Sequence, residues 1–133
     1  MRNNFDYEEP IPTIKLENEV SNLELSKRLK ELNVKQESYF TWSKAMDRNA
    51  WRIENTQFFA VDRRRDISAF TVAELGEMLP IDTCSWRNIA SRYVCKWTQG
   101  QHQEYEQTEF ADTEANARAK MLIYLLENKL ITL

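Results

Sequence analysis

The carboxy-terminal part of the chain places the strongest constraint on its fold. Residues 113–133 read TEANARAKMLIYLLENKLITL, with alanine at 115, 117 and 119 and an unbroken apolar run over 121–126. Small and apolar residues recur at 115, 119, 122 and 126, which predicts one helix from about Thr113 to Asn128. Its alanine half can approach a sheet closely, whereas its apolar half needs neighbours on two sides. We expect a sheet on one side, and residues 21–32, the N-terminal segment or a second subunit on the other.

Two earlier helices are predicted by capping signals. Ser21 and Glu24 form an S-x-x-E capping box, which predicts a helix over 21–32. Asn33 follows as a residue suited to the left-handed conformation that ends many helices. The inward stripe of this helix consists of leucines: Leu25, Leu29 and Leu32.

A second capping box, Thr71 with Glu74, predicts another helix. Phe70 and Leu75 have the spacing of a hydrophobic staple, which fixes the angle at which the chain enters the helix. This helix must end before Pro80, because the residue preceding a proline avoids the α region.

Aromatic and β-branched runs between these helices predict strands. The runs before the second helix are 38–43, 50–55, 56–61 and 66–70. Residues 91–110 predict a β-hairpin that turns at Gln99-Gly100. In its first strand Tyr93, Cys95 and Trp97 share one face, and Val94, Lys96 and Thr98 share the other. The polar return strand is expected at a sheet edge, and residues 80–91 are expected to be irregular.

These elements predict an α+β fold in one domain. We expect an antiparallel sheet of four to six strands with three helices, in the order α-β-β-α-β-β-α, and the helices packed mainly on one face. Two β-β-α units follow one another in this order, which suggests an internal repeat. Residues 1–20 are expected to be extended or poorly ordered, because Pro10 and Pro12 forbid a regular helix there; residues 21–133 form the domain.

Charge and cysteine content limit the classes of function. The formal net charge is −3 and the sequence pI is near 5.3, which does not favour broad non-specific binding to nucleic acid. Two cysteines, Cys84 and Cys95, are too few for a disulfide framework, and no residue spacing suggests a metal site or a cofactor. No apolar stretch is long enough to span a membrane. We therefore expect a soluble protein of a reducing cytoplasm.

Acidic residues are concentrated after the predicted hairpin turn. Glu104, Glu106, Glu109 and Asp112 lie in a stretch without lysine or arginine. Charges that alternate along a strand are typical of a solvated edge, and the alternative is an acidic surface that meets a basic protein partner. If the apolar half of the last helix is instead covered by a second copy of the chain, the interface would contain Met121, Tyr124 and Leu125.

Arginines form a second candidate surface. Arg63, Arg64 and Arg65 lie between Asp62 and Asp66, which indicates either a charged loop or a contact with nucleic acid. Arginines 52, 87 and 92 and tryptophans 42, 51, 86 and 97 could join this surface and stack on bases. A helix-turn-helix is a further alternative, but it requires a helix from Lys35 where the sequence favours a strand.

No motif in the sequence indicates a particular reaction. The single histidine, His102, lies at the predicted hairpin turn, and two glycines cannot build the usual phosphate-binding loops or a nucleophile elbow. We therefore expect a protein that is not an enzyme.

Three segments resemble a group of small uncharacterised proteins of bacteriophages and prophages. They are 23–38 (LELSKRLKELNVKQES), 70–80 (FTVAELGEMLP) and 113–131 (TEANARAKMLIYLLENKLI). The resemblance implies that the protein acts in the cytoplasm of a bacterial host cell. It does not indicate an activity or any functional residue. The sequence thus predicts a non-enzymatic binding module, with a protein partner or homodimer preferred and nucleic acid as the alternative.

Overall fold

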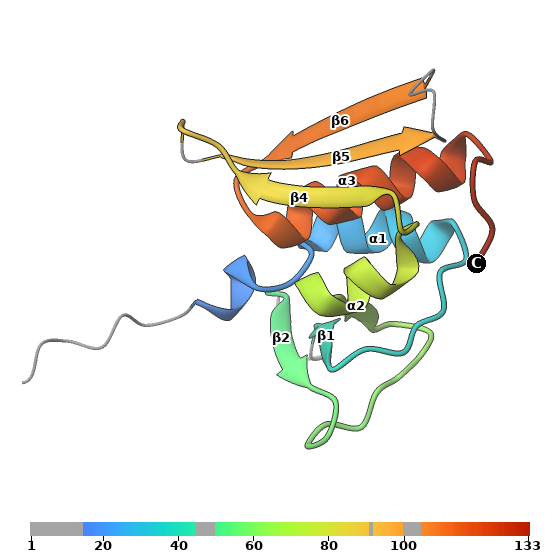
Figure 1. Cartoon of the computed structure of the whole chain (residues 1–133). Helices are drawn as coiled ribbons and strands as arrows, with labels where there is room; N and C mark the ends of the chain where they lie inside the picture. The colour runs from blue at the N-terminus through green and yellow to red at the C-terminus, as the bar shows by residue number, and fades with distance from the viewer. Residues whose placement is uncertain (1–14, 45–49, 91, 100–104) are drawn as a thin grey trace, which may run out of the picture.

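The computed structural model describes residues 15–44, 50–90, 92–99 and 105–133. It confirms an α+β fold, in which three α-helices accompany two three-stranded antiparallel sheets (Figure 1). In chain order the elements are η2 Leu16–Asn18, α1 Leu23–Glu31, β1 Phe40–Ser43, β2 Arg52–Asn55, β3 Ile67–Ala69, α2 Val72–Met78, β4 Thr83–Arg87, β5 Tyr93–Gln99, β6 Tyr105–Ala111 and α3 Glu114–Glu127.

The prediction of a single sheet is wrong. One sheet has the strand order β2-β1-β3, and the other is a meander with the order β4-β5-β6. Each sheet is followed by a helix, so the chain contains two β-β-β-α units rather than two β-β-α units. The first strand is central in one unit and the second strand is central in the other, so the units share element order but not strand pairing.

Strand β4 lies in the segment 80–91, for which the sequence predicts irregular structure. Its side chains toward α3 include Thr83 and Ser85, and Ser85 hydrogen-bonds to residues of α3. The strand is short, and its alternation is inverted: hydroxyls occupy the inward positions, whereas Cys84 and Trp86 face outward, so the pattern does not indicate an apolar face toward a core. The prediction of neighbouring β5, whose inward residues are apolar, is confirmed.

The strand expected over 56–61 does not form. Asn55 ends β2 by accepting a hydrogen bond at its side-chain oxygen from the backbone N–H of Gln57, at 2.9 Å. Thr56 donates through its hydroxyl to the carbonyl of Ser38, at 3.0 Å. Thr56 therefore stays bonded to the segment before β1, and the backbone N–H of Phe58 donates to the carbonyl of Asn55 at 3.1 Å, which closes a turn. Aromatic content alone is an insufficient signal for a strand here.

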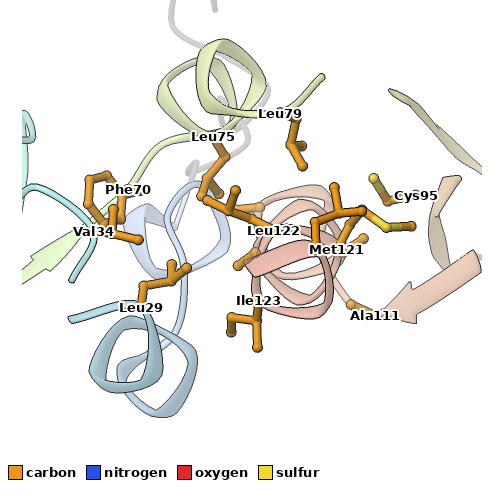
Figure 2. Packing of buried hydrophobic residues seen from close by; sticks show 14 of the residues in the cluster. Leu29, Val34, Phe70, Leu75, Leu79, Cys95, Ala111, Met121, Leu122 and Ile123 are labelled. Atoms are coloured by element: carbon orange, nitrogen blue, oxygen red, sulfur yellow. The ribbon is translucent and has the colours of Figure 1, made fainter. Parts of the chain in front are cut away.

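Helix α3 occupies the centre of the molecule. In Figure 1 it lies between the β4-β5-β6 sheet and helices α1 and α2. Figure 2 shows Met121 pointing toward Cys95 of the sheet and Leu122 toward Leu75 of α2, with Leu29 of α1 on a further side. The apolar half of α3 is therefore covered on several sides from within the same chain.

The start of α1 differs from the prediction by one residue. Asn22 is the N-cap, and its side-chain oxygen accepts a hydrogen bond from the backbone N–H of Leu25 at 2.8 Å. Ser21 is instead fully buried: its hydroxyl accepts a hydrogen bond from the backbone N–H of Phe70, at 3.0 Å. Sequence spacing could not distinguish a cap from a buried serine that joins two distant segments.

The capping predictions for the other helix ends are confirmed. Thr71 and Glu74 form the capping box of α2, and the Thr113 hydroxyl accepts from the backbone N–H of Asn116 at the start of α3. Asn33 has a φ of 65°, and the backbone N–H of Val34 donates to the carbonyl of Leu29 at 3.1 Å, which closes α1 with a Schellman motif.

Helix α3 ends in the same motif, but with a lysine where glycine is favoured. Lys129 has a φ of 54°, and the backbone N–H of Leu130 donates to the carbonyl of Leu125 at 2.9 Å. We expect Lys129→Gly to raise the free energy of unfolding by about 0.5–1 kcal/mol, because glycine has no Cβ to strain this conformation. Urea denaturation measures the change. Lys120→Gly, inside the same helix, is the control and should destabilise by about 1 kcal/mol; equal effects of the two substitutions would contradict the prediction.

The last residue of the expected N-terminal segment packs against the domain. Val20 is fully buried and pairs with Thr71 through an isolated β-bridge. Residues 1–14 of the expected extended segment lie outside the described residues. Within the described part of the chain, no helix is long and apolar enough to cross a membrane.

Candidate binding face

The β4-β5-β6 sheet has one face that none of the three described helices covers. All three lie on the same side of this sheet in Figure 1. The side chains that alternate away from α3 define what we call the open face: Cys84, Trp86, Val94, Lys96, Thr98, Glu106, Thr108 and Phe110. The inward residues of β5, Cys95 and Trp97, are in the hydrophobic core, which confirms the predicted division of this strand into two faces.

An apolar row crosses the open face. Trp86 of β4 lies opposite Val94 of β5, and Val94 lies opposite Phe110 of β6. Trp86 and Phe110 each keep 44% of their surface exposed, whereas Val94 keeps only 3%. Because no described helix packs on this face, we infer that the two aromatic side chains themselves shield the valine.

Positive charge lies beside this row. The Arg92 guanidinium lies 6.0 Å from the centre of the Phe110 ring, which is within reach of a cation–π interaction. Lys96 lies in the adjacent row and pairs with Glu106 at 3.2 Å. Arg87, at the end of β4, is exposed, but it alternates with Ser85 and lies opposite Tyr93, on the other face of the sheet. Two cationic side chains therefore accompany one carboxylate in the described part of the open face, although the formal net charge of the chain is −3.

The predicted acidic residues do not share one surface. Glu106 is on the open face, whereas Glu109 alternates to the other side of β6 and accepts a hydrogen bond from Gln107 at 3.2 Å. Asp112 follows the strand and accepts a hydrogen bond from the Asn116 side chain at 3.2 Å. Glu104 and His102 lie outside the described residues. The described carboxylates do not form the continuous row that a basic partner would need.

Arg63, Arg64 and Arg65 are exposed on the turn before β3, which lies at the other end of the molecule from the open face (Figure 1). Asp62 and Asp66 hold this turn: the backbone N–H of Asp62 donates to the Asp66 carboxylate at 2.7 Å, and that of Arg64 donates to the Asp62 carboxylate at 3.0 Å. The three arginines are therefore separated from Arg87, Arg92 and Trp86, with which the sequence could have grouped them.

Of the residues proposed for an oligomer interface, Met121 and Leu125 have 0% of their surface exposed. Neither side chain has surface to offer a second copy, and Tyr124 is partly buried against the core. The helix-turn-helix alternative is wrong, because the chain after Val34 is not helical and enters β1 at Phe40.

A partly buried polar cluster lies between β4 and α3. The Ser85 hydroxyl donates to the Glu114 carboxylate at 2.7 Å and accepts from Arg118 Nε at 2.9 Å. Arg118 Nη1 also donates to the carbonyl of Val72 in α2, at 2.9 Å. No spacing in the sequence indicates this cluster, since its members are separated by up to 46 positions. These bonds join α2, α3 and β4, so we assign the cluster a structural role.

The two cysteines have different environments. Cys84 is exposed on the open face, and Cys95 is fully buried. Burial raises the pKa of the Cys95 thiol to about 12, because the thiolate would lose its hydration, and the positive charge of Arg118 offsets only part of this effect. Reagents that attack thiolates near neutral pH should therefore modify Cys84 and spare Cys95.

Comparison with known proteins identifies no relative. No protein-family model, no curated protein and no solved structure matches this chain. The resemblance to phage and prophage proteins therefore stays a prediction from sequence. Among the described residues, no group of three or more histidine, cysteine, aspartate or glutamate side chains is placed to hold a metal ion.

Proposed function

We propose that the chain is a non-enzymatic binding module whose partner docks on the open face of the β4-β5-β6 sheet. The observation that carries the proposal is the row Trp86–Val94–Phe110, in which two half-exposed aromatic side chains flank a buried valine on a sheet face that the described helices leave uncovered. Tryptophan and arginine are the residues most enriched where binding energy is concentrated, and both are present here.

The charge of the open face favours an anionic partner. Arg92 and Lys96 outnumber the single described carboxylate, that of Glu106. The sequence favours a protein partner at the acidic strand, or a second copy of the chain at Met121, Tyr124 and Leu125. The dispersed carboxylates and the burial of Met121 and Leu125 lead us to prefer the open face to either surface. We retain the bacteriophage or prophage context as part of the proposal, so the partner is sought in a bacterial extract.

Cys84 provides a site-specific test, because it lies in the row next to Lys96 on the open face and the other thiol is buried. A thiol-directed photo-crosslinker attached at Cys84 should form adducts in a bacterial extract. Trp86→Ala combined with Phe110→Ala should reduce the adduct yield by at least tenfold, since each aromatic anchor is expected to contribute about 1–2 kcal/mol. Gel electrophoresis before and after protease or nuclease treatment measures the yield and the class of the partner.

The matched control moves the crosslinker to the other side of the molecule. Cys84→Ser combined with Ala73→Cys places the thiol on the surface of α2. Adducts that form equally from position 73, or that persist when both aromatics are removed, would show that the open face is not the binding surface. Circular dichroism checks that the variants fold, which we expect because both aromatic side chains are half-exposed.

A further inference from the structure

We propose that the ligand of the open face is single-stranded nucleic acid, with two of its bases stacked on Trp86 and Phe110. This inference rests on the proposed function and adds the class of partner. Three features of the described residues carry it: the spacing of the aromatic rings, the position of the cationic side chains and the size of the face.

The two aromatic residues have positions suited to neighbouring unstacked bases. Trp86 and Phe110 occupy the same row of the sheet with one strand between them, so their backbones are roughly 10 Å apart at the usual strand spacing. Each ring has exposed surface, and the buried Val94 between them presents no polar group. Aromatic rings on an open sheet are a common platform for single-stranded nucleic acid, because every base has a flat face that can stack on them.

The cationic side chains lie where phosphates of the same strand would pass. Arg92 is beside Phe110, and Lys96 is one row away on the central strand. Lys96 already pairs with Glu106, so we assign the main phosphate contact to Arg92. A net positive face on a net negative chain selects for an anionic ligand and restricts it to this face.

The size of the face favours a narrow ligand. Three strands of up to seven residues give an area of about 14 by 23 Å, or roughly 300 Å². A stable protein–protein interface needs about 800 Å² from each partner, so a folded acidic protein would have to extend well beyond this sheet. Two or three nucleotides fit within it. A duplex is excluded as the preferred ligand, because its bases are stacked on one another and cannot lie on Trp86 and Phe110.

The test is fluorescence anisotropy of the full chain with labelled RNA and DNA of mixed sequence, about 12 nucleotides long, at roughly 50 mM salt, where phosphate contacts are strong. We expect binding of single strands, and at least tenfold weaker binding of the corresponding duplexes. Trp86→Ala and Phe110→Ala should each weaken binding by about 5- to 150-fold, which corresponds to about 1–3 kcal/mol per stacked base. Trp86→Phe should retain most of the affinity, because it retains a ring.

The arginines give an independent readout. Arg92→Gln should reduce the slope of log K against log salt by about 0.7, the value for one phosphate contact with a single strand. The matched control is Arg63→Gln, Arg64→Gln and Arg65→Gln together, which removes more charge from the other end of the molecule and should leave affinity and discrimination against the duplex unchanged.

Three outcomes would overturn the inference. The first is no binding of single strands at a protein concentration of about 100 μM, which equals the weakest dissociation constant typical of non-specific contacts. The second is binding that Trp86→Ala and Phe110→Ala leave intact. The third is equal competition by poly-glutamate. The last outcome, together with crosslinks from Cys84 to a protein, would replace nucleic acid by an acidic protein and leave the proposed function standing. If no crosslink from Cys84 depended on Trp86 and Phe110, both this inference and the proposed function would be contradicted.

Discussion

Replacing Leu125 by alanine is expected to lower the free energy of unfolding by about 2–5 kcal/mol, the range for a large aliphatic side chain removed from a packed core. Leu125 is fully buried in the core cluster, where α3 is surrounded by the sheet, α1 and α2. Alanine would lose the transfer free energy of the removed carbon atoms and leave a cavity that these neighbours can fill only in part. Urea denaturation followed by circular dichroism measures the change.

The control is Leu133→Ala, because Leu133 keeps 63% of its surface exposed. Its effect should lie within about 0.5 kcal/mol of zero. An oligomer interface at Leu125 predicts something different: the midpoint of the wild-type transition would depend on protein concentration, and Leu125→Ala would abolish that dependence. We expect the midpoint to be independent of protein concentration for both the wild type and Leu125→Ala, since the side chain of Leu125 is covered by its own chain.

Gly76→Ala is expected to destabilise the protein by about 1–2 kcal/mol, although alanine is the better helix former by about 1 kcal/mol. A Cβ at position 76 would overlap Arg118 Nη1. Arg118 is the flexible partner, but its guanidinium is held by the Val72 carbonyl and the Ser85 hydroxyl, both at 2.9 Å. Moving it to make room would break these bonds and separate it from Glu114.

A double-mutant cycle with Arg118→Ala tests this explanation. Arg118→Ala alone should cost about 1–3 kcal/mol, because Ser85 and Glu114 lose a charged partner in a partly buried site. In that background Gly76→Ala should change sign and stabilise by about 0.5–1 kcal/mol, as helix propensity alone requires. Thermal denaturation of the four proteins gives the coupling, and a Gly76→Ala effect that is the same in both backgrounds would refute the steric account.

Local sequence signals predict the helices well because the interactions behind them span only a few residues. Thr71 with Glu74, Asn33 and Thr113 each cap a helix through a partner three to five positions away. Pro80 ends α2 by its own covalent geometry. The alternation along β5 also separates Cys95 and Trp97 from Val94 and Lys96, since the period of two is a property of the strand backbone itself.

Prediction from sequence fails where a residue is satisfied by a distant partner. Ser21 matches the pattern of a cap, but its hydroxyl bonds to Phe70, 49 positions away. Strand β4 carries Ser85 toward the core, because Glu114 and Arg118 of α3 provide the hydrogen bonds that allow its hydroxyl to be buried.

Some features of the candidate site can likewise be predicted from sequence, and others depend on the tertiary structure. Spacing along β6 is sufficient to place Glu106 and Glu109 on opposite faces, and composition shows that the chain as a whole is acidic. Only the register between strands brings Trp86, Val94 and Phe110 into one row with Arg92 beside it, and only the packing of α3 on the opposite face leaves that row uncovered by the described helices.

The sequence by itself determined which segments are helical, where most of them begin and end, and which residues of the central strand point inward, because these depend on hydrogen bonds and periodicities within a few residues. Tertiary structure alone decided that there are two sheets, that α3 is enclosed by its own chain, and that an aromatic row with Arg92 beside it is left uncovered by the described helices. Each of these depends on pairing between segments far apart in the chain, and the energy of such a pair is a property of both partners together.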